Sequence, residues 1–192
     1  MKSDIENFLY QFIDLPKDII SLFEEIVTYT EIEPFDFFVK TNENPTDFFI
    51  IKTGLIRSYI ETEDGKEITR NLFSEGHLAS SLTAMVKKIP SELNYQALTK
   101  VTGYKANFFK FKELTAKHHE LSMFYIKALE SSYLKVEDII LDISTHSATE
   151  RYLILRERIP NIDNLIAQRY IASYLNVSPV QLSRIKKSLL NK

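Results

Sequence analysis

Residues 167–187 read AQRYIASYLNVSPVQLSRIKK and have the pattern of two helices joined by a sharp turn. The spacing predicts a first helix over about 168–174. Its inward positions are Ile171, Ala172 and Leu175. Asn176 stands where the turn needs a left-handed residue, a conformation that asparagine tolerates. Ser178 is a good N-cap and Pro179 a good first residue for the second helix, so the stretch predicts a helix-turn-helix.

The second helix of this pair presents a polar and basic outer face. Its inner face carries Ile185 together with either Val180 or Leu182. Its outward positions are Gln181, Ser183, Arg184, Lys186 and Lys187. The major groove of DNA is wide enough to admit such a helix. The alternative is an ordinary helical hairpin whose basic face is only solvated.

Charge is distributed unevenly along the chain. Residues 147–192 contain eight Lys/Arg and three Asp/Glu, a net charge of +5. The remaining residues contain 16 Lys/Arg and 23 Asp/Glu, a net charge of −7, and the net charge of −2 for the whole chain hides this contrast. A basic segment attached to an acidic body indicates a polyanionic partner for that segment.

Composition limits the class of protein. The chain has 192 residues, of which 44% are hydrophobic, so one or two domains with a buried core are expected. The absence of cysteine excludes disulfides, iron–sulfur clusters and thiol chemistry. The first residues include acids and no long apolar run, and no stretch is long enough to span a membrane. We therefore expect a cytoplasmic protein without a membrane partner.

The pattern along the chain changes from helix to strand and back. Apolar residues within 3–27 have helical spacing interrupted at Pro16, which predicts two short helices. Short runs with turn residues between them predict strands at 29–33, 48–51, 55–61, 67–73, 94–99 and 102–109. Asp64-Gly65 is the expected hairpin turn. These strands favour an antiparallel sandwich or jelly roll.

A long helix is expected over about 114–144. One stripe of it has the a/d spacing of a coiled coil and carries Ile126, Leu129, Tyr133, Val136, Ile140 and Ile143. We call these six residues the seam. They predict a two-fold dimer, which is the commonest oligomer and suits a reader of paired DNA half-sites. The alternative is a helix that docks on its own sheet through this stripe.

A second helix starts directly after the long one. Residues 147–150 have the pattern of a capping box, and Pro160 ends the helix that follows. The segment 145–147 is therefore the expected boundary and a candidate hinge. It separates a domain over 1–146 from a domain over 147–192.

This order of elements resembles the Crp/Fnr family of bacterial transcription regulators. The residues that carry the resemblance are FIIKTGLIR (49–57), DGKE (64–67), FSEG (73–76), ERY (150–152), YIASYL (170–175) and LSRI (182–185). The resemblance implies an α+β fold: N-terminal helices, an antiparallel β-roll of the cyclic-nucleotide-binding type, a long dimerisation helix and a C-terminal helix-turn-helix domain. The implied function is homodimeric, DNA-binding transcription regulation. Because the stretch before Gln168 is short, the β-wing typical of the family is expected to be reduced or absent.

The expected ligand pocket departs from the family's cyclic-nucleotide binders. Their phosphate cassette resembles Gly-Glu-Leu followed by Arg-Ser/Thr-Ala, and here neither the ribose-binding Glu nor the phosphate-pairing Arg is present. The residues at these places are Gly76, His77, Leu78, Ser91 and Glu92. We therefore expect no cyclic AMP binding, no cofactor, and an effector of unknown chemistry or none. A role for His77 in sensing an anion or pH stays open.

The resemblance also assigns roles within the helix-turn-helix. Arg184 matches the family position that contacts a guanine, and arginine pairs bidentately with guanine. Gln181 and Val180 are the further candidate base readers, through adenine and a thymine methyl. The candidate phosphate contacts, which position the protein without specifying sequence, are Gln168, Arg169, Ser178, Lys186 and Lys187.

Two other classes of function remain as alternatives. One is a ligand-sensing module whose helical tail docks a protein partner, which the basic outer face disfavours. The other is an enzyme of the cupin kind, which needs a His/Glu metal cluster on its strands, whereas 28–111 holds the single histidine His77. No catalytic or metal site is expected. The expected partners are double-stranded DNA, a second copy of the chain and an effector, with RNA polymerase as a further candidate.

Overall fold

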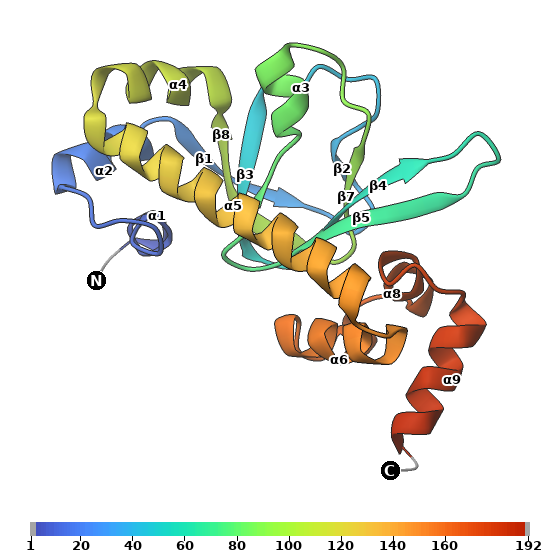
Figure 1. Ribbon diagram of the computed structural model, residues 1–192. Helices are drawn as coiled ribbons and strands as arrows, with labels where there is room; N and C mark the ends of the chain where they lie inside the picture. The colour runs from blue at the N-terminus through green and yellow to red at the C-terminus, as the bar shows by residue number, and fades with distance from the viewer. Residues whose placement is uncertain (1–2, 191–192) are drawn as a thin grey trace.

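The middle of the chain forms two four-stranded antiparallel sheets that face each other as a β-roll (Figure 1). The computed structural model describes residues 3–190. One sheet has the order β1-β8-β3-β6, from strands Val27–Ile32, Val101–Asn107, Asp47–Thr53 and Leu78–Ala79. The other has the order β2-β7-β4-β5, from strands Phe37–Val39, Asn94–Ala97, Ile56–Glu61 and Glu67–Phe73. The predicted hairpin joins β4 to β5, and Gly65 supplies the positive φ of 77°.

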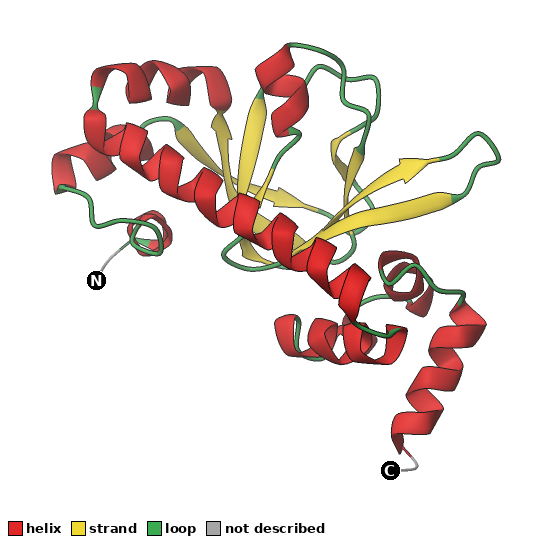
Figure 2. Cartoon of the chain, in the orientation of Figure 1, coloured by secondary structure: helices red, strands yellow, loops and turns green. Residues whose placement is uncertain are grey.

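The helices before and after the roll pack on one of its ends. The N-terminal pair is α1 (Asp4–Leu9) and α2 (Lys17–Glu24), as expected from the interruption at Pro16. They form an aromatic-rich core with α4 (Phe108–Lys117) and with the first turns of α5 (His119–Thr145), which contribute Leu121 and Phe124. This core anchors the long helix to the roll at its N-terminal end, and Figure 2 shows α5 running from there to the C-terminal helices.

The structure differs from the sequence prediction in the bounds of two elements and in three short elements that the sequence did not indicate. The strand expected over 102–109 ends at Asn107, because that side chain accepts hydrogen bonds from the backbone of Phe109 and Lys110 and begins α4. The long helix expected from about residue 114 begins at His119, since His118 is extended (φ −126°, ψ 112°). The short elements β2, β6 and α3 (Leu82–Lys87) were not predicted.

The seam does not dock on its own sheet. Its six residues are 37–63% exposed, so the alternative in which this stripe covers the chain's own sheet is wrong. The side chains that α5 buries are Leu121, Phe124 and Ala128, near its N-terminal end. The helix therefore presents an exposed apolar stripe along most of its length.

The C-terminal domain, described over residues 147–190, is entirely helical. Its helices are α6 (Ala148–Arg158), α7 (Ile162–Leu165), α8 (Gln168–Tyr174) and α9 (Pro179–Leu190). The predicted capping box is present, with Ser147 and Glu150 exchanging backbone and side-chain hydrogen bonds at the start of α6. No residue of 147–190 lies in a strand, which agrees with the expected reduction of the wing. Lys192, counted above in the net charge of residues 147–192, lies outside the described residues.

The C-terminal domain shares a hydrophobic core with the roll. Leu55 and Leu98 of the roll are buried in the same cluster as Ile171, Leu175 and Leu182. Figure 1 shows α8 lying beneath the β4–β5 hairpin, with α9 leading away to the C-terminus. Within residues 3–190, no helix combines the length and apolar character that crossing a bilayer requires.

Candidate nucleic-acid interface

The turn between α8 and α9 has the geometry that the sequence predicts. Asn176 adopts the left-handed conformation with φ 53°. Ser178 caps α9, because its Oγ accepts a hydrogen bond from the backbone N of Gln181 at 3.1 Å. The backbone N of Val177 donates to the carbonyl of Ala172 at 3.0 Å and closes the turn. The helix-turn-helix is thus built from the local signals that were read from the sequence.

The packing of α9 settles which of its residues face inward. Leu182 and Ile185 are buried against α8, whereas Val180 is 62% exposed, so Leu182 and not Val180 completes the inner face. The other candidates for base contact, Gln181 and Arg184, are exposed as Val180 is. The structure therefore presents the three predicted base readers to solvent.

The basic side chains of this domain differ in whether they form hydrogen bonds or ion pairs within the protein. Arg184 and Lys187 have neither a hydrogen bond nor an ion pair within residues 3–190. Lys186 instead donates to Asp163 Oδ1 at 2.7 Å, while Tyr152 donates to the other carboxylate oxygen at 2.6 Å. Burial raises the pKa of Asp163, but these two hydrogen bonds together with the charges of Lys186 and Arg156 outweigh burial and hold the pKa below its usual value. Lys186 is thus engaged by its own domain.

Two candidate phosphate contacts on α8 also have partners. Gln168 Nε2 donates to the carbonyl of Pro179 at 2.9 Å and so joins the starts of α8 and α9. Arg169 Nη2 donates to Tyr170 Oη at 2.7 Å, and this bond raises the pKa of Arg169. The guanidinium of Arg169 stays exposed. The cations of the interface without a partner are therefore Arg184 and Lys187 on α9, whereas Arg169 on α8 is exposed but hydrogen-bonded to Tyr170.

The residues expected to form the degenerate pocket do not form one polar cluster. His77 Nδ1 lies 3.1–3.2 Å from the N, O and Oγ atoms of Ser74 in its own loop. Burial, and then the charge of Lys135 on α5, lowers the pKa of His77. Ser91 is buried and shares a 2.9 Å hydrogen bond with Ser81, whereas Glu92 is exposed. Gly76 has φ 76°, and the neighbouring Leu78 lies in β6, partly buried in the core of the N-terminal helices.

A cluster of buried apolar residues from both sheets lies between them. The buried cluster there includes Phe49, Ile56 and Tyr95, with Phe38 and Phe73 packed against it. The rings of Phe73 and Tyr95 are stacked with centroids 6.1 Å apart, and burial raises the pKa of Tyr95 to about 12. The interior of the roll is therefore an apolar core of aliphatic and aromatic side chains.

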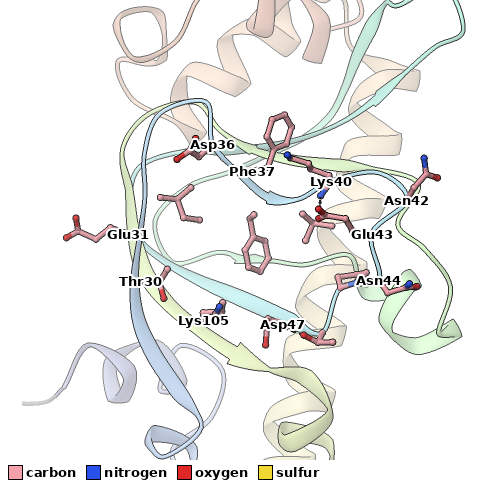
Figure 3. A pocket seen from close by; sticks show the side chains of 15 residues that line it. Thr30, Glu31, Asp36, Phe37, Lys40, Asn42, Glu43, Asn44, Asp47 and Lys105 are labelled. Carbon is pink, nitrogen blue, oxygen red and sulfur yellow. Dashed lines mark hydrogen bonds between the residues drawn. The ribbon is translucent and has the colours of Figure 1, made fainter.

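An open cavity of about 880 Å³ lies at the edge of the roll, beside β1, β2 and the loop that leads into β3 (Figure 3). Its lining includes the carboxylates Glu31, Asp36, Glu43 and Asp47 and the amines Lys40 and Lys105. None of the five residues of the expected pocket is part of it. Carboxylates outnumber amines in this lining, which disfavours an anionic ligand. Within residues 3–190, no group of three or more His, Cys, Asp or Glu side chains is placed to hold a metal ion.

A buried arginine on the roll was not singled out from the sequence. Arg57 in β4 is 1% exposed. Its Nε and Nη2 donate to Gln96 Oε1 at 3.1 and 2.7 Å, and Nη2 pairs with Glu67 at 2.7 Å. Its guanidinium carbon lies 3.9 Å from the ring centroid of Tyr59 and 4.3 Å from that of Tyr170 in α8. The only signal in the sequence is a charged residue within an apolar run. The residues that cover it, such as Gln96 and Tyr170, are distant in sequence and meet it only in the folded protein.

Comparisons with known proteins identify the fold. No protein-family model matches the chain, and no curated protein matches it by sequence. Among solved structures it resembles FixK2 from Bradyrhizobium japonicum, with 17% identity over 86% of this chain and 85% of that one, at a TM-score of 0.73. A protein from Eubacterium rectale assigned to the Crp/Fnr transcriptional regulators has 16% identity over 96% and 88%, at 0.71. A variant of CooA from Carboxydothermus hydrogenoformans has 15% identity over 100% and 86%, at 0.67. The chain therefore has the fold of the Crp/Fnr regulators.

Proposed function

We propose that this chain is a cytoplasmic, homodimeric transcription regulator that binds double-stranded DNA through α9 and has no enzymatic activity. The observation that carries the proposal is α9 itself: one face is buried against α8, and the remaining surface of the helix presents Gln181, Arg184 and Lys187 to solvent. Arginine and glutamine are the side chains that read guanine and adenine edges, and lysine neutralises phosphates. A fold shared with transcription regulators supports the same conclusion.

The exposed seam on α5 supports the dimer. A stripe of six apolar side chains that its own chain leaves uncovered fits a second copy, which would bring two α9 helices to one duplex. RNA polymerase and an effector are further partners within this proposal, and the open cavity beside β1 and β2, which includes none of the expected pocket residues, does not point to a particular effector. The competing module that docks a protein partner would not need free cations on α9.

We expect the dimer to select a pseudo-palindrome whose half-site centres are about one helical turn, roughly 10 base pairs, apart. The test is selection of bound sequences from random duplex DNA by the purified protein, followed by titration of the selected site at several salt concentrations. Affinity should fall steeply with salt because Lys and Arg displace condensed counterions. If no salt-dependent duplex binding appears, with or without cell extract as a source of effector, the protein-docking module replaces this proposal.

Cyclic AMP and cyclic GMP are expected not to bind. Glu92 stands where a phosphate-pairing arginine would be needed, and the open cavity at the edge of the roll is rich in carboxylates, which repel a phosphate. Isothermal titration calorimetry measures this directly, with a cyclic-nucleotide-binding regulator titrated in parallel as the positive control. A dissociation constant in the low micromolar range for either nucleotide would contradict this expectation.

A further inference from the structure

Two polar contacts tie α8 to the β4–β5 hairpin. In the first, Tyr170 of α8 covers the buried guanidinium of Arg57, which Glu67 and Gln96 hold from the roll side. In the second, Ser173 Oγ accepts a hydrogen bond from the backbone N of Thr69 at 2.9 Å and donates to the carbonyl of Glu67 at 3.0 Å. We call these residues the clamp. Both contacts join the roll to the helix-turn-helix.

The first contact continues toward the DNA-facing surface. Two guanidinium groups lie against the ring of Tyr170. The guanidinium carbon of Arg57 is 4.3 Å from the ring centroid, and that of Arg169 is 4.7 Å from it. Tyr59, Arg57, Tyr170 and Arg169 therefore form an alternating stack of rings and guanidiniums that begins on β4 and ends at an exposed cation. Stacking of this kind is directional, because the cation must lie over the ring. It fixes orientation as well as distance.

Holding α8 also holds α9. Gln168 bonds to Pro179, Val177 bonds to Ala172, and the two helices share the core around Leu182. The pair therefore moves as one body. Apart from the clamp, the C-terminal domain is joined to α5 by the short segment 145–147 and by the 2.8 Å pair between Arg158 and Asp142, and to the roll by the buried side chains of Leu55 and Leu98. Apolar packing is not directional, so the clamp supplies the directional contacts that orient the recognition helix on the roll.

We infer that Arg57 and Ser173 are positioning residues that set the half-site spacing this protein accepts in DNA. The inference rests on the proposed function, because it concerns how two α9 helices meet one duplex. One added base pair turns one half-site by about 35° and moves it by about 3.4 Å. Rigidly held recognition helices cannot follow that displacement, whereas helices on a loosened domain can.

The test compares the selected site with sites whose spacer is one base pair longer or shorter. We expect the intact protein to lose at least ten-fold in affinity for either altered spacer. Arg57→Met and Ser173→Ala should lose only about two- to three-fold, while their base preference within each half-site stays unchanged. Arg70→Met removes the same charge from an exposed position of the same hairpin, and Ser173→Thr keeps the hydroxyl. Both controls should retain the original spacer discrimination.

A second measurement does not depend on DNA. The chain has no cysteine, so Glu92→Cys and Ser188→Cys, both at exposed positions, allow nitroxide labels on the roll and on α9. Spin–spin distance measurements on labelled protein diluted with unlabelled protein should give a narrow distribution, which Ser173→Ala or Arg57→Met broadens. If Arg57→Met fails to fold by thermal denaturation, Ser173→Ala still decides the question.

The outcomes separate the two proposals. If the intact protein tolerates every spacer equally, or if both variants keep its spacer profile and its narrow distance distribution, the positioning role is wrong and the DNA-binding function stands. If the intact protein binds no duplex, the proposed function fails. The distance distributions then still decide whether the clamp fixes the domain, and unchanged distributions overturn it.

Discussion

Replacing Val136 and Ile140 together by Glu should convert the protein from a dimer to a monomer and weaken DNA binding about 100-fold or more. Both side chains lie in the middle of the exposed seam, so a dimer through α5 would bury four new carboxylates without partners. A monomer keeps its recognition helix but loses the second binding event, which contributes factors of about 100 to 10,000 in bivalent binding. Light scattering gives the oligomeric state, and titration of the selected palindrome gives the affinity.

The matched control places the same charges on the other side of the helix. Ser131→Glu with Thr145→Glu adds two carboxylates about half a turn away from the seam, and this variant should remain dimeric and bind DNA. An intact protein that is already monomeric at tens of micromolar would show that the seam is not a dimer interface. A double seam variant that stays dimeric would lead to the same conclusion.

Replacing Arg184 by Ala should remove discrimination at one base pair of each half-site. Arg184 is exposed and without a partner in the described chain, so its guanidinium is available to a guanine edge. A bidentate contact of this kind contributes about 1–3 kcal/mol of discrimination, or roughly 5- to 150-fold. Competition binding between the selected site and a scrambled duplex measures the loss, which should be confined to the selected site.

Lys187→Ala is the matched control on the same helix. As a phosphate contact, Lys187 should weaken all sequences alike and reduce the salt slope by about one unit. If Arg184→Ala instead weakens both duplexes equally, Arg184 is a phosphate contact, and Gln181 becomes the next candidate base reader. The comparison therefore separates base reading from charge neutralisation on one helix face.

The elements that the sequence predicts well carry their own local signals. Asn176, Ser178 and Pro179 define the turn and the start of α9, and the Asp64-Gly65 pair defines a hairpin, because each needs only its immediate neighbours. The short strands β2 and β6 have too few residues for a periodic pattern. The break at His118 interrupts an otherwise helical stretch without a proline or glycine to mark it.

In the candidate site, too, some features follow from local sequence signals and others depend on tertiary contacts. The exposed face of α9 follows from helical spacing, and the structure decides between the two alternatives for its inner face, because Leu182 is buried and Val180 is exposed. That Lys186 is paired with Asp163, and that α8 covers Arg57, depends on residues that are distant in sequence and meet only in the fold. Periodicity identifies the outward side of a strand or helix, but it does not tell whether another element lies against it.

The contact between Ser173 and β5 has a consequence for solubility. β5 is the last strand of its sheet, so its outer backbone groups are open to pairing with a strand of another molecule. Ser173 occupies two of those groups, and α8 covers the adjoining surface. The helix-turn-helix thus caps a sheet edge that would otherwise be a template for aggregation, and Ser173 is the side chain that closes its two backbone groups.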